Sequence, residues 1–239
     1  PNYYTVVNYM DVNRATNNPP LDWLCQSFNY QDHEGNDYTL YPFFWRMKEK
    51  GSVLATAGSA GIVIAVRDST NNDNNCGQPG ENKRANYVAI LNADSSISRY
   101  LHIKKNSAKV TLGQFVQEGQ TLASIGSSGS SSNPHLHFDL QYFRTDNNEY
   151  DFVEPFYSTK GNCNTATNDS WWKNQKTYID PQLNRIMTHY GTPVLQGDIN
   201  STKILDFCPE IEDAKAKAQF NAGEPLIVGV ALSHVNRYD

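Results

Sequence analysis

Four of the six histidines in this 239-residue chain fall in three short segments within its first 140 residues. The segments are His33-Glu34-Gly35-Asn36-Asp37, Tyr100-Leu101-His102 and Asn133-Pro134-His135-Leu136-His137-Phe138. A catalytic zinc site needs three nitrogen or oxygen ligands and one open coordination position. His33, Asp37 and one histidine of the last segment could supply these ligands. The other two histidines would then flank the open position, where groups that accept and donate protons are needed.

The last of the three segments predicts a β-strand. Residues i and i+2 of a strand point to the same face, so His135 and His137 are expected to share one groove. Leu136 and Phe138 then point to the opposite, packed face. The Gly- and Ser-rich residues 126–132 before the strand favour turns that allow other groups to approach it closely.

The first segment also begins like the helical metal motif His-Glu-x-x-His, with Asp37 in place of the second histidine. That motif requires a helix, because only a helix puts residues i and i+4 on one face. Gly35 and Asn36 are poor helix formers, and no helical apolar period surrounds them. The sequence therefore favours a loop here, with Glu34 as a solvated residue rather than a general base.

Taken together, the motifs His-x-Gly-x-Asp, Tyr-x-His and Gly-x-Ser-Gly leading into Pro-His-Leu-His-Phe resemble those of the lysostaphin/LytM-type zinc endopeptidases. These bacterial enzymes cut peptide bonds in peptidoglycan and, in some members, in glycine-rich proteins such as elastin. The resemblance runs from about Asn8 to about Tyr142 and includes residues 110–120, which read as a paired hairpin of that fold.

The resemblance implies a role for each motif residue. The zinc ligands would be His33, Asp37 and His137, holding one Zn²⁺ per chain, and the two catalytic histidines would be His102 and His135. Which of the two catalytic histidines is the general base stays open at this stage.

Two positions depart from the usual family pattern. Asn133 stands where the family more often has glycine, and Asp139 stands where glutamate is usual. Neither is a ligand position, so the departures bear on how substrate fits rather than on whether the site is active.

The fold class expected is mainly β: an antiparallel catalytic core of lysostaphin/LytM type with a shallow groove, followed by a small β-containing C-terminal region. Runs rich in β-branched and aromatic residues predict strands at 53–57, 62–66, 87–91 and 98–102. A short helix is expected over 43–50, and the polar insertion 69–86 is expected to form a loop at the groove rim.

Two domains follow from this pattern: a catalytic domain over 1–158, including an N-terminal extension, and a C-terminal region over 159–239 of open function. Within the second, residues 203–207 and 225–232 predict strands, the latter buried. Trp171 and Trp172 are expected to pack against the core, with a surface for glycan as the alternative.

Cys25, Cys76, Cys163 and Cys208 are even in number and widely spaced, with no Cys-x-x-Cys pair. Two disulfides in an oxidising compartment are therefore favoured over a thiolate zinc site or free thiols, and the pairing Cys25–Cys76 and Cys163–Cys208 is our choice among three. The chain begins at Pro1 without a leader-like segment, which suggests a mature secreted or extracellular form, periplasmic before export.

The remaining composition limits the partners. The formal net charge is −5, which disfavours nucleic acid, and no apolar run is long enough to span a membrane. A monomer is expected. His189 and His234 are interpreted as ordinary polar residues outside the site, while Tyr100 either packs on its strand or hydrogen-bonds a reaction intermediate.

The function expected is hydrolysis of peptide bonds in peptidoglycan cross-links, beside glycine or another small residue. One alternative is a secreted protease of the same chemistry that acts on glycine-rich proteins such as elastin. An alternative of a different class is a catalytically silent module that binds cell wall or activates another hydrolase. Silent members usually lack ligand residues, whereas all five motif positions are filled in this chain.

Overall fold

The computed structural model describes residues 4–14, 19–69, 84–146, 148–156, 170–178, 181–193 and 214–233. In these ranges the chain is mainly β, and every strand pairing is antiparallel, as the sequence predicts. No helix among the described residues has the length and apolar character needed to cross a membrane.

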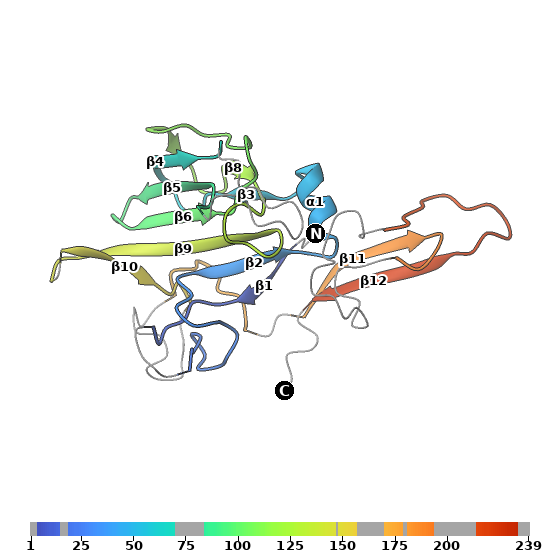
Figure 1. Ribbon diagram of the computed structural model, residues 1–239, viewed down its shortest axis with the longest axis horizontal. Coiled ribbons are helices and arrows are strands. Elements are labelled where there is room, and N and C mark those ends of the chain that lie inside the picture. The colour runs from blue at the N-terminus through green and yellow to red at the C-terminus, as the bar shows by residue number, and fades with distance from the viewer. Residues whose placement is uncertain are drawn as a thin grey trace.

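One eight-stranded sheet contains most of the strands between Tyr4 and Val153 (Figure 1). Seven of its strands lie side by side in the order β1, β2, β9, β6, β5, β4 and β7. The eighth, β10, pairs with residues 140–144 of β9. The bounds are β1 (Tyr4–Asn8), β2 (Asn36–Leu40), β4 (Gly61–Arg67), β5 (Tyr87–Asn92), β6 (Ile97–Leu101), β7 (Phe115–Val116), β9 (His135–Arg144) and β10 (Glu149–Val153).

The register between neighbouring strands decides which side chains meet. Asp37 on β2 lies directly opposite His137 on β9, and Leu101 on β6 lies opposite His137 from the other side. Directly opposed residues project to the same face of a sheet. The two chemistry-bearing segments that are about 100 residues apart in sequence are thus joined by strand pairing.

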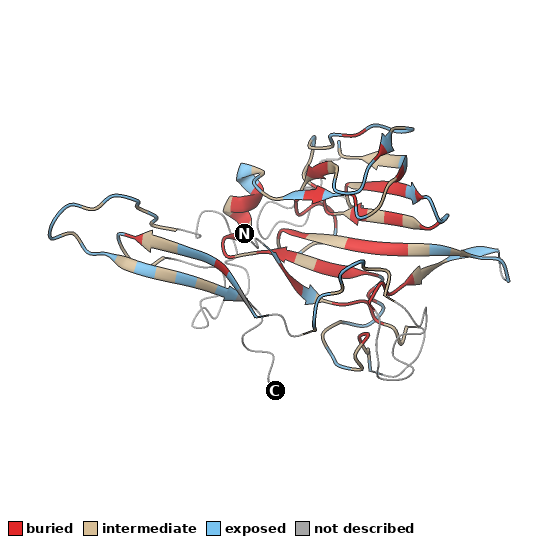
Figure 2. Ribbon diagram, turned by 180° about the vertical axis from the view of Figure 1, so that it is seen from behind, coloured by how far each residue is buried: buried red, intermediate tan, exposed pale blue. Residues whose placement is uncertain are grey.

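The main hydrophobic core lies on the face of the sheet opposite His137. Figure 2 shows that buried residues are frequent along the strands of this sheet. Val88, Tyr100 and Phe138 occupy one row across β5, β6 and β9 and are buried. A second layer, the small sheet of β3 (Leu54–Thr56) and β8 (Thr121–Ser124), packs Ala55 and Leu122 against this core. The β-branched and aromatic residues of these strands suit such a half-buried pleated surface.

The predicted short helix is confirmed as α1 (Phe44–Lys50). It buries Trp45 and Met47 and ends at Gly51, whose φ of 58° is left-handed. A residue without a Cβ adopts this conformation at little cost, and Gly51 N–H then donates to the carbonyl of Lys48. The four predicted strands at 53–102 are likewise confirmed as β3, β4, β5 and β6.

The segment 110–120 does not form the predicted hairpin. Its strand β7 pairs with β4, and the following strand β8 pairs with β3, so the two belong to different sheets. Gly113 and Gly119, with φ of 81° and 80°, form the turns that redirect the chain. The segment that resembled a paired hairpin therefore contains two turns that lead from one sheet to the other.

The C-terminal region contains a second two-stranded sheet, β11 (Gln182–His189) and β12 (Ile227–Ser233). The sequence predicts β12, but the expectation that it is buried is wrong: Val228 and Val230 are 59% and 56% exposed. In the described residues β12 pairs with β11 alone, and nothing described covers its apolar face. The predicted strand at 203–207 lies outside the described residues.

The tandem tryptophans pack, as expected. The Trp172 ring lies 5.5 Å from Phe138 and 5.8 Å from Phe156, measured between ring centroids, and Trp171 lies against Tyr142 at 6.2 Å. They attach the segment after 170 to the core face of the main sheet.

Cys25 is disulfide-bonded, and the described residues contain no free cysteine. Cys76, Cys163 and Cys208 lie outside the described residues, as do His234 and most of the insertion 69–86. The pairing chosen from the sequence therefore stays a prediction.

Candidate active site

The structure brings His33, Asp37 and His137 together on the face of the sheet that is turned away from the main core. His33 Nε2 lies 3.2 Å from Asp37 Oδ1 and 3.2 Å from His137 Nδ1, and His137 Nδ1 lies 3.0 Å from Asp37 Oδ1. Four ligands arranged tetrahedrally about zinc at 2.0–2.1 Å are separated from one another by about 3.3 Å. The three atoms thus have nearly the spacing of three corners of a zinc tetrahedron, a spacing that could hold a metal ion.

A hydrogen bond that orients the His33 ring supports this fit. Its Nδ1–H donates to the backbone carbonyl of Tyr9 at 2.7 Å, so the neutral ring presents a lone pair at Nε2. That lone pair faces the carboxylate oxygen of Asp37 at 3.2 Å. A proton or a metal ion between these two atoms stabilises such a close buried contact, and the nitrogen and carboxylate donors present fit a bound metal.

Asp37 is held ready as a ligand. Its second oxygen, Oδ2, accepts a hydrogen bond from Asn8 Nδ2 at 3.0 Å, which leaves Oδ1 for the cluster. Burial acts to raise the pKa of this carboxyl, but its interactions with His137 and His33 outweigh burial and hold the pKa well below its usual range. Asp37 is therefore ionised at neutral pH, the form that binds a metal.

His135 and His102 lie beside the cluster. Their rings are 4.5 Å apart, and the His102 ring is 6.0 Å from that of His137. His135 Nε2 lies 3.5 Å from Asp37 Oδ1. His102 Nδ1–H donates to Ser128 O at 2.6 Å and His135 Nδ1–H to Asn133 O at 2.7 Å. Each ring consequently keeps an unprotonated Nε2.

The environment keeps both rings neutral. Burial lowers the pKa of His102 to about 3, and the nearby His135 and His137 lower it further in the same direction. Burial also lowers the pKa of His135. Two neutral imidazoles next to a metal-binding cluster can accept protons at physiological pH.

The position of His102 depends on a left-handed residue and a close backbone approach. His102 has a φ of 61° and directly follows strand β6, so its side chain leaves the alternation of that strand. Gly126 lies against the next turn: a Cβ on it would be 2.5 Å from Lys104 N and 2.7 Å from His102 O. The glycine allows the 126–128 loop to bring the Ser128 carbonyl to the His102 ring, as the turn-rich sequence suggests.

Other residues singled out from the sequence lie elsewhere. Tyr100 is buried on the core face and accepts a hydrogen bond from Gly58 N–H at 2.7 Å, so its packing role is confirmed.

Glu34 is exposed, and Asp37 lies in a strand, so the helical metal motif is wrong. His189 is fully buried on the separate β11–β12 sheet, where its Nδ1 bonds to Ala214 O.

Several residues at the site were missed by the sequence reasoning. Asn8 and Tyr9 support the ligands from the end of β1, and no motif marks them. Tyr30 stacks on His33 with 4.3 Å between ring centroids, and burial together with Asp37 raises the pKa of its phenol. A tyrosine three residues before His33 was visible in the sequence, but its spacing alone carries no prediction.

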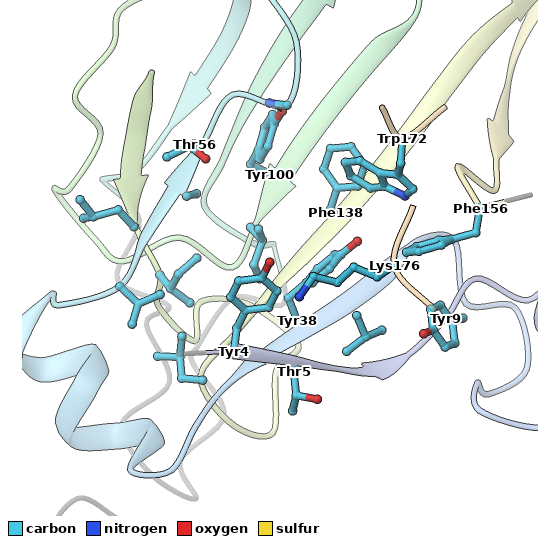
Figure 3. Close-up of a pocket in the computed structure, with 18 of the residues that line it drawn as sticks. Tyr4, Thr5, Tyr9, Tyr38, Thr56, Tyr100, Phe138, Phe156, Trp172 and Lys176 are labelled. Atoms are coloured by element: carbon cyan, nitrogen blue, oxygen red, sulfur yellow. Dashed lines mark hydrogen bonds between the residues drawn. The ribbon is translucent and has the colours of Figure 1, made fainter. Parts of the chain in front are cut away.

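A cavity of about 310 Å³ lies on the opposite, core face of the same sheet (Figure 3). Leu136 and Phe138 line it from β9, alternating with His135 and His137 on the other face, and Trp172 closes one side. Its described lining contains no His, Asp, Glu or Cys. The hollow is therefore not where hydrolytic chemistry is positioned.

Glu154 is buried behind the site and accepts hydrogen bonds from Asn36 Nδ2 at 3.3 Å and Phe156 N–H at 3.0 Å. Burial raises the pKa of its carboxyl from 4.5 to about 8. Between pH 4.5 and about pH 8 the Glu154 carboxyl is ionised in the unfolded chain but protonated in the folded protein. The free energy of unfolding therefore falls as the pH rises through this range. The total loss is on the order of a few kcal/mol.

Glu154→Gln should remove this loss, because glutamine keeps an acceptor oxygen and does not ionise. Chemical denaturation at pH 5 and pH 8 measures it: the drop in stability between the two should be smaller in Glu154→Gln than in the wild type. Glu149→Gln, an exposed position on β10, is the matched control and should leave the drop unchanged. Equal drops in all three proteins would show that Glu154 is not the titrating group.

Comparison with known proteins finds a family match for part of the chain. Residues 44–151 match the model of peptidase family M23. Residues 44–151 are thus similar to an M23 peptidase domain, in agreement with the resemblance seen in the motifs. His33 and Asp37 lie before the matched range, and strand pairing of β2 with β9 brings Asp37 to His137.

Two relatives are named as peptidoglycan endopeptidases. Peptidoglycan DD-endopeptidase ShyC of Vibrio cholerae serotype O1 is 29% identical over 144 residues, covering 56% of this chain and 29% of that protein. Peptidoglycan DD-endopeptidase ShyA of the same organism is 40% identical over 108 residues, covering 45% and 20%. The chain thus spans less than a third of the length of either relative.

Among solved structures, the catalytic domain of lysostaphin from Staphylococcus simulans is similar. It is 21% identical, with a TM-score of 0.37, over 56% of this chain and 84% of that domain.

Proposed function

We propose that this protein is a zinc metalloendopeptidase that hydrolyses peptide bonds in peptidoglycan cross-links. The observation that carries the proposal is the cluster of His33 Nε2, Asp37 Oδ1 and His137 Nδ1 with two neutral histidines beside it, in a chain that is similar to an M23 peptidase domain over residues 44–151. The catalytic unit is proposed to be residues 1–158, because β1 and β2 supply part of the site.

Each ligand has a fixed orientation. Tyr9 O holds His33, and Asn8 holds Asp37. When bound, a zinc ion supplies a Lewis acid that polarises a carbonyl and allows water to lose a proton near neutral pH. The metal must be held in one geometry for this, and the backbone and side-chain partners of the ligands provide it.

His102 and His135 are proposed to handle protons. In each, Nδ1–H is used by a backbone carbonyl, so only Nε2 can take part in the reaction. One Nε2 accepts the proton of the attacking water, and the other, once protonated, stabilises charge on the carbonyl oxygen or donates to the leaving amine. The ring contact of 4.5 Å places the two groups close enough to act on one peptide unit.

The substrate proposed is a peptide of the cell wall, in line with the names of the relatives ShyC and ShyA. We propose cleavage beside glycine or another small residue, because a small side chain lets an extended backbone lie close to the ligand cluster. The secreted location and the monomeric state expected from the sequence are part of the same proposal.

Mass spectrometry of products tests this function. Purified peptidoglycan and a glycine-rich protein, elastin, are each incubated with the zinc-loaded enzyme, and new termini are mapped. The expected result is new amine termini in peptidoglycan peptides, next to glycine or alanine. If no peptide is released from peptidoglycan, the proposal is contradicted. If elastin alone is cleaved, the substrate is a glycine-rich protein and not peptidoglycan.

A further inference from the structure

His137 has a second ring nitrogen whose surroundings are as specific as those of the first. Nδ1 faces the ligand cluster, and Nε2, on the other side of the ring, lies 3.7 Å from Asp139 Oδ2. The two residues are i and i+2 on β9 and so share one face of the sheet. A ring whose Nδ1 presents a lone pair carries its hydrogen on Nε2, the nitrogen that lies 3.7 Å from the Asp139 carboxylate.

Asp139 is held in place by Arg99. The pair lies directly across strands β6 and β9, and Arg99 Nε donates to both carboxylate oxygens at 2.8 and 3.0 Å. Gln141 Nε2 donates to Oδ1 at 3.3 Å. The Asp139 side chain is fully buried, whereas that of Arg99 is 30% exposed and lies over the Phe152 ring. A buried carboxylate held by these partners does not rotate freely.

Gly35 closes the space around this pair. A Cβ at Gly35 would be 2.7 Å from His137 Nε2, 3.0 Å from the Asp139 Cβ and 2.4 Å from Phe138 O. The main chain of the His-x-Gly-x-Asp segment therefore lies directly on the His137–Asp139 contact. This close approach explains why a residue without a side chain stands between the two ligands His33 and Asp37.

We propose that Asp139, fixed by Arg99 and covered by Gly35, is the positioning residue that sets the ring orientation and tautomer of His137. The inference rests on the proposed function in that it takes His137 as a zinc ligand. At 3.7 Å the contact is longer than a hydrogen bond, and a movement of about 0.6 Å closes it. Asp139 acts on the metal only through His137 and is not itself a ligand.

The test measures zinc affinity and ring tautomer in the same variants. Asp139→Ala and Asp139→Asn remove the carboxylate, Asp139→Glu retains one, and Asp146→Asn breaks the exposed Arg144–Asp146 pair at the end of β9 as a matched control. Zinc dissociation constants come from competition with a chromophoric chelator. The loss of an orienting partner typically weakens metal binding 10- to 100-fold. We expect this loss in the alanine and asparagine variants, a smaller one in Asp139→Glu, and none in the control.

Nitrogen-15 NMR of the metal-free protein at pH 8 measures the tautomer of the His137 ring. This tautomer should not change if Asp139 only stabilises the fold. The wild type should carry its hydrogen on Nε2, and Asp139→Ala should populate both tautomers. Zinc affinity within about threefold of wild type in Asp139→Ala, or a wild-type His137 protonated on Nδ1, overturns the proposal. If Asp139→Ala does not fold, the isosteric Asp139→Asn decides by the same criteria.

Failure of the proposed function gives a different result. A wild-type protein that binds no zinc refutes the zinc peptidase, whereas zinc-loaded wild type with unaffected Asp139 variants refutes this inference alone.

Discussion

Replacing Asp37 by alanine should abolish zinc binding and peptide hydrolysis together. Asp37 Oδ1 lies within 3.0–3.2 Å of both His137 Nδ1 and His33 Nε2, so it is the shared neighbour of the other two ligands. Losing the metal removes several kcal/mol of transition-state stabilisation, and each 1.36 kcal/mol is a factor of ten in rate. The rate should fall by roughly 1,000-fold or more.

Zinc content per chain and the hydrolysis rate are measured on the same preparation. His33→Ala and His137→Ala should behave as Asp37→Ala does. His189→Gln, a buried histidine on the separate β11–β12 sheet, is the control for loss of a histidine and should keep zinc. Full zinc content in Asp37→Ala would remove it from the ligand set.

Replacing His102 or His135 by alanine should separate activity from metal binding. Both rings lie beside the cluster, with Nδ1 engaged by a backbone carbonyl and Nε2 available. Each variant should retain close to one zinc per chain while the hydrolysis rate falls roughly 100-fold or more, the usual contribution of general acid–base or oxyanion stabilisation.

Glu34→Gln is the matched control for this second prediction. Glu34 lies between two ligands in sequence but is exposed, so the substitution should leave the rate unchanged. In the helical metal motif the same glutamate would be the general base, and its loss would be severe. If His135→Ala loses zinc while His137→Ala keeps it, the two roles are exchanged. If His102→Ala keeps full activity, His102 is structural.

The local periodicity of the sequence predicted much of this site. The His-x-His spacing places His135 and His137 on one face because strand side chains alternate, and the same rule puts Phe138 in the core. Gly35 and Asn36 argued correctly against a helix. These predictions depend on interactions within a few residues, which a single sequence displays.

The parts that the sequence did not predict depend on long-range contacts. Asn8 reaches Asp37 across 29 residues, and Arg99 reaches Asp139 across 40. Such pairs arise from the register of antiparallel strands, which the hydrophobic pattern of each strand specifies only in part. Asp139 appeared in the sequence merely as a departure from a family pattern, because its contact with His137 and Arg99 becomes visible only once β6 and β9 are paired.

The prediction that strand β12 is buried was wrong for a related reason. A continuous apolar run such as 225–232 is typical of a buried strand, yet burial depends on what packs against it. In the described residues its partner is β11 alone, so Val228 and Val230 remain exposed. Composition predicted the strand but not its neighbours.

Anomalous diffraction from crystals of the zinc-loaded protein, recorded above and below the zinc absorption edge, tests the central claim most directly. The account predicts one strong peak per chain, about 2.0–2.2 Å from His33 Nε2, Asp37 Oδ1 and His137 Nδ1, with His102 and His135 outside bonding distance. A peak bonded to His102 or His135 in place of one of these three, or no peak in zinc-loaded crystals, would contradict it.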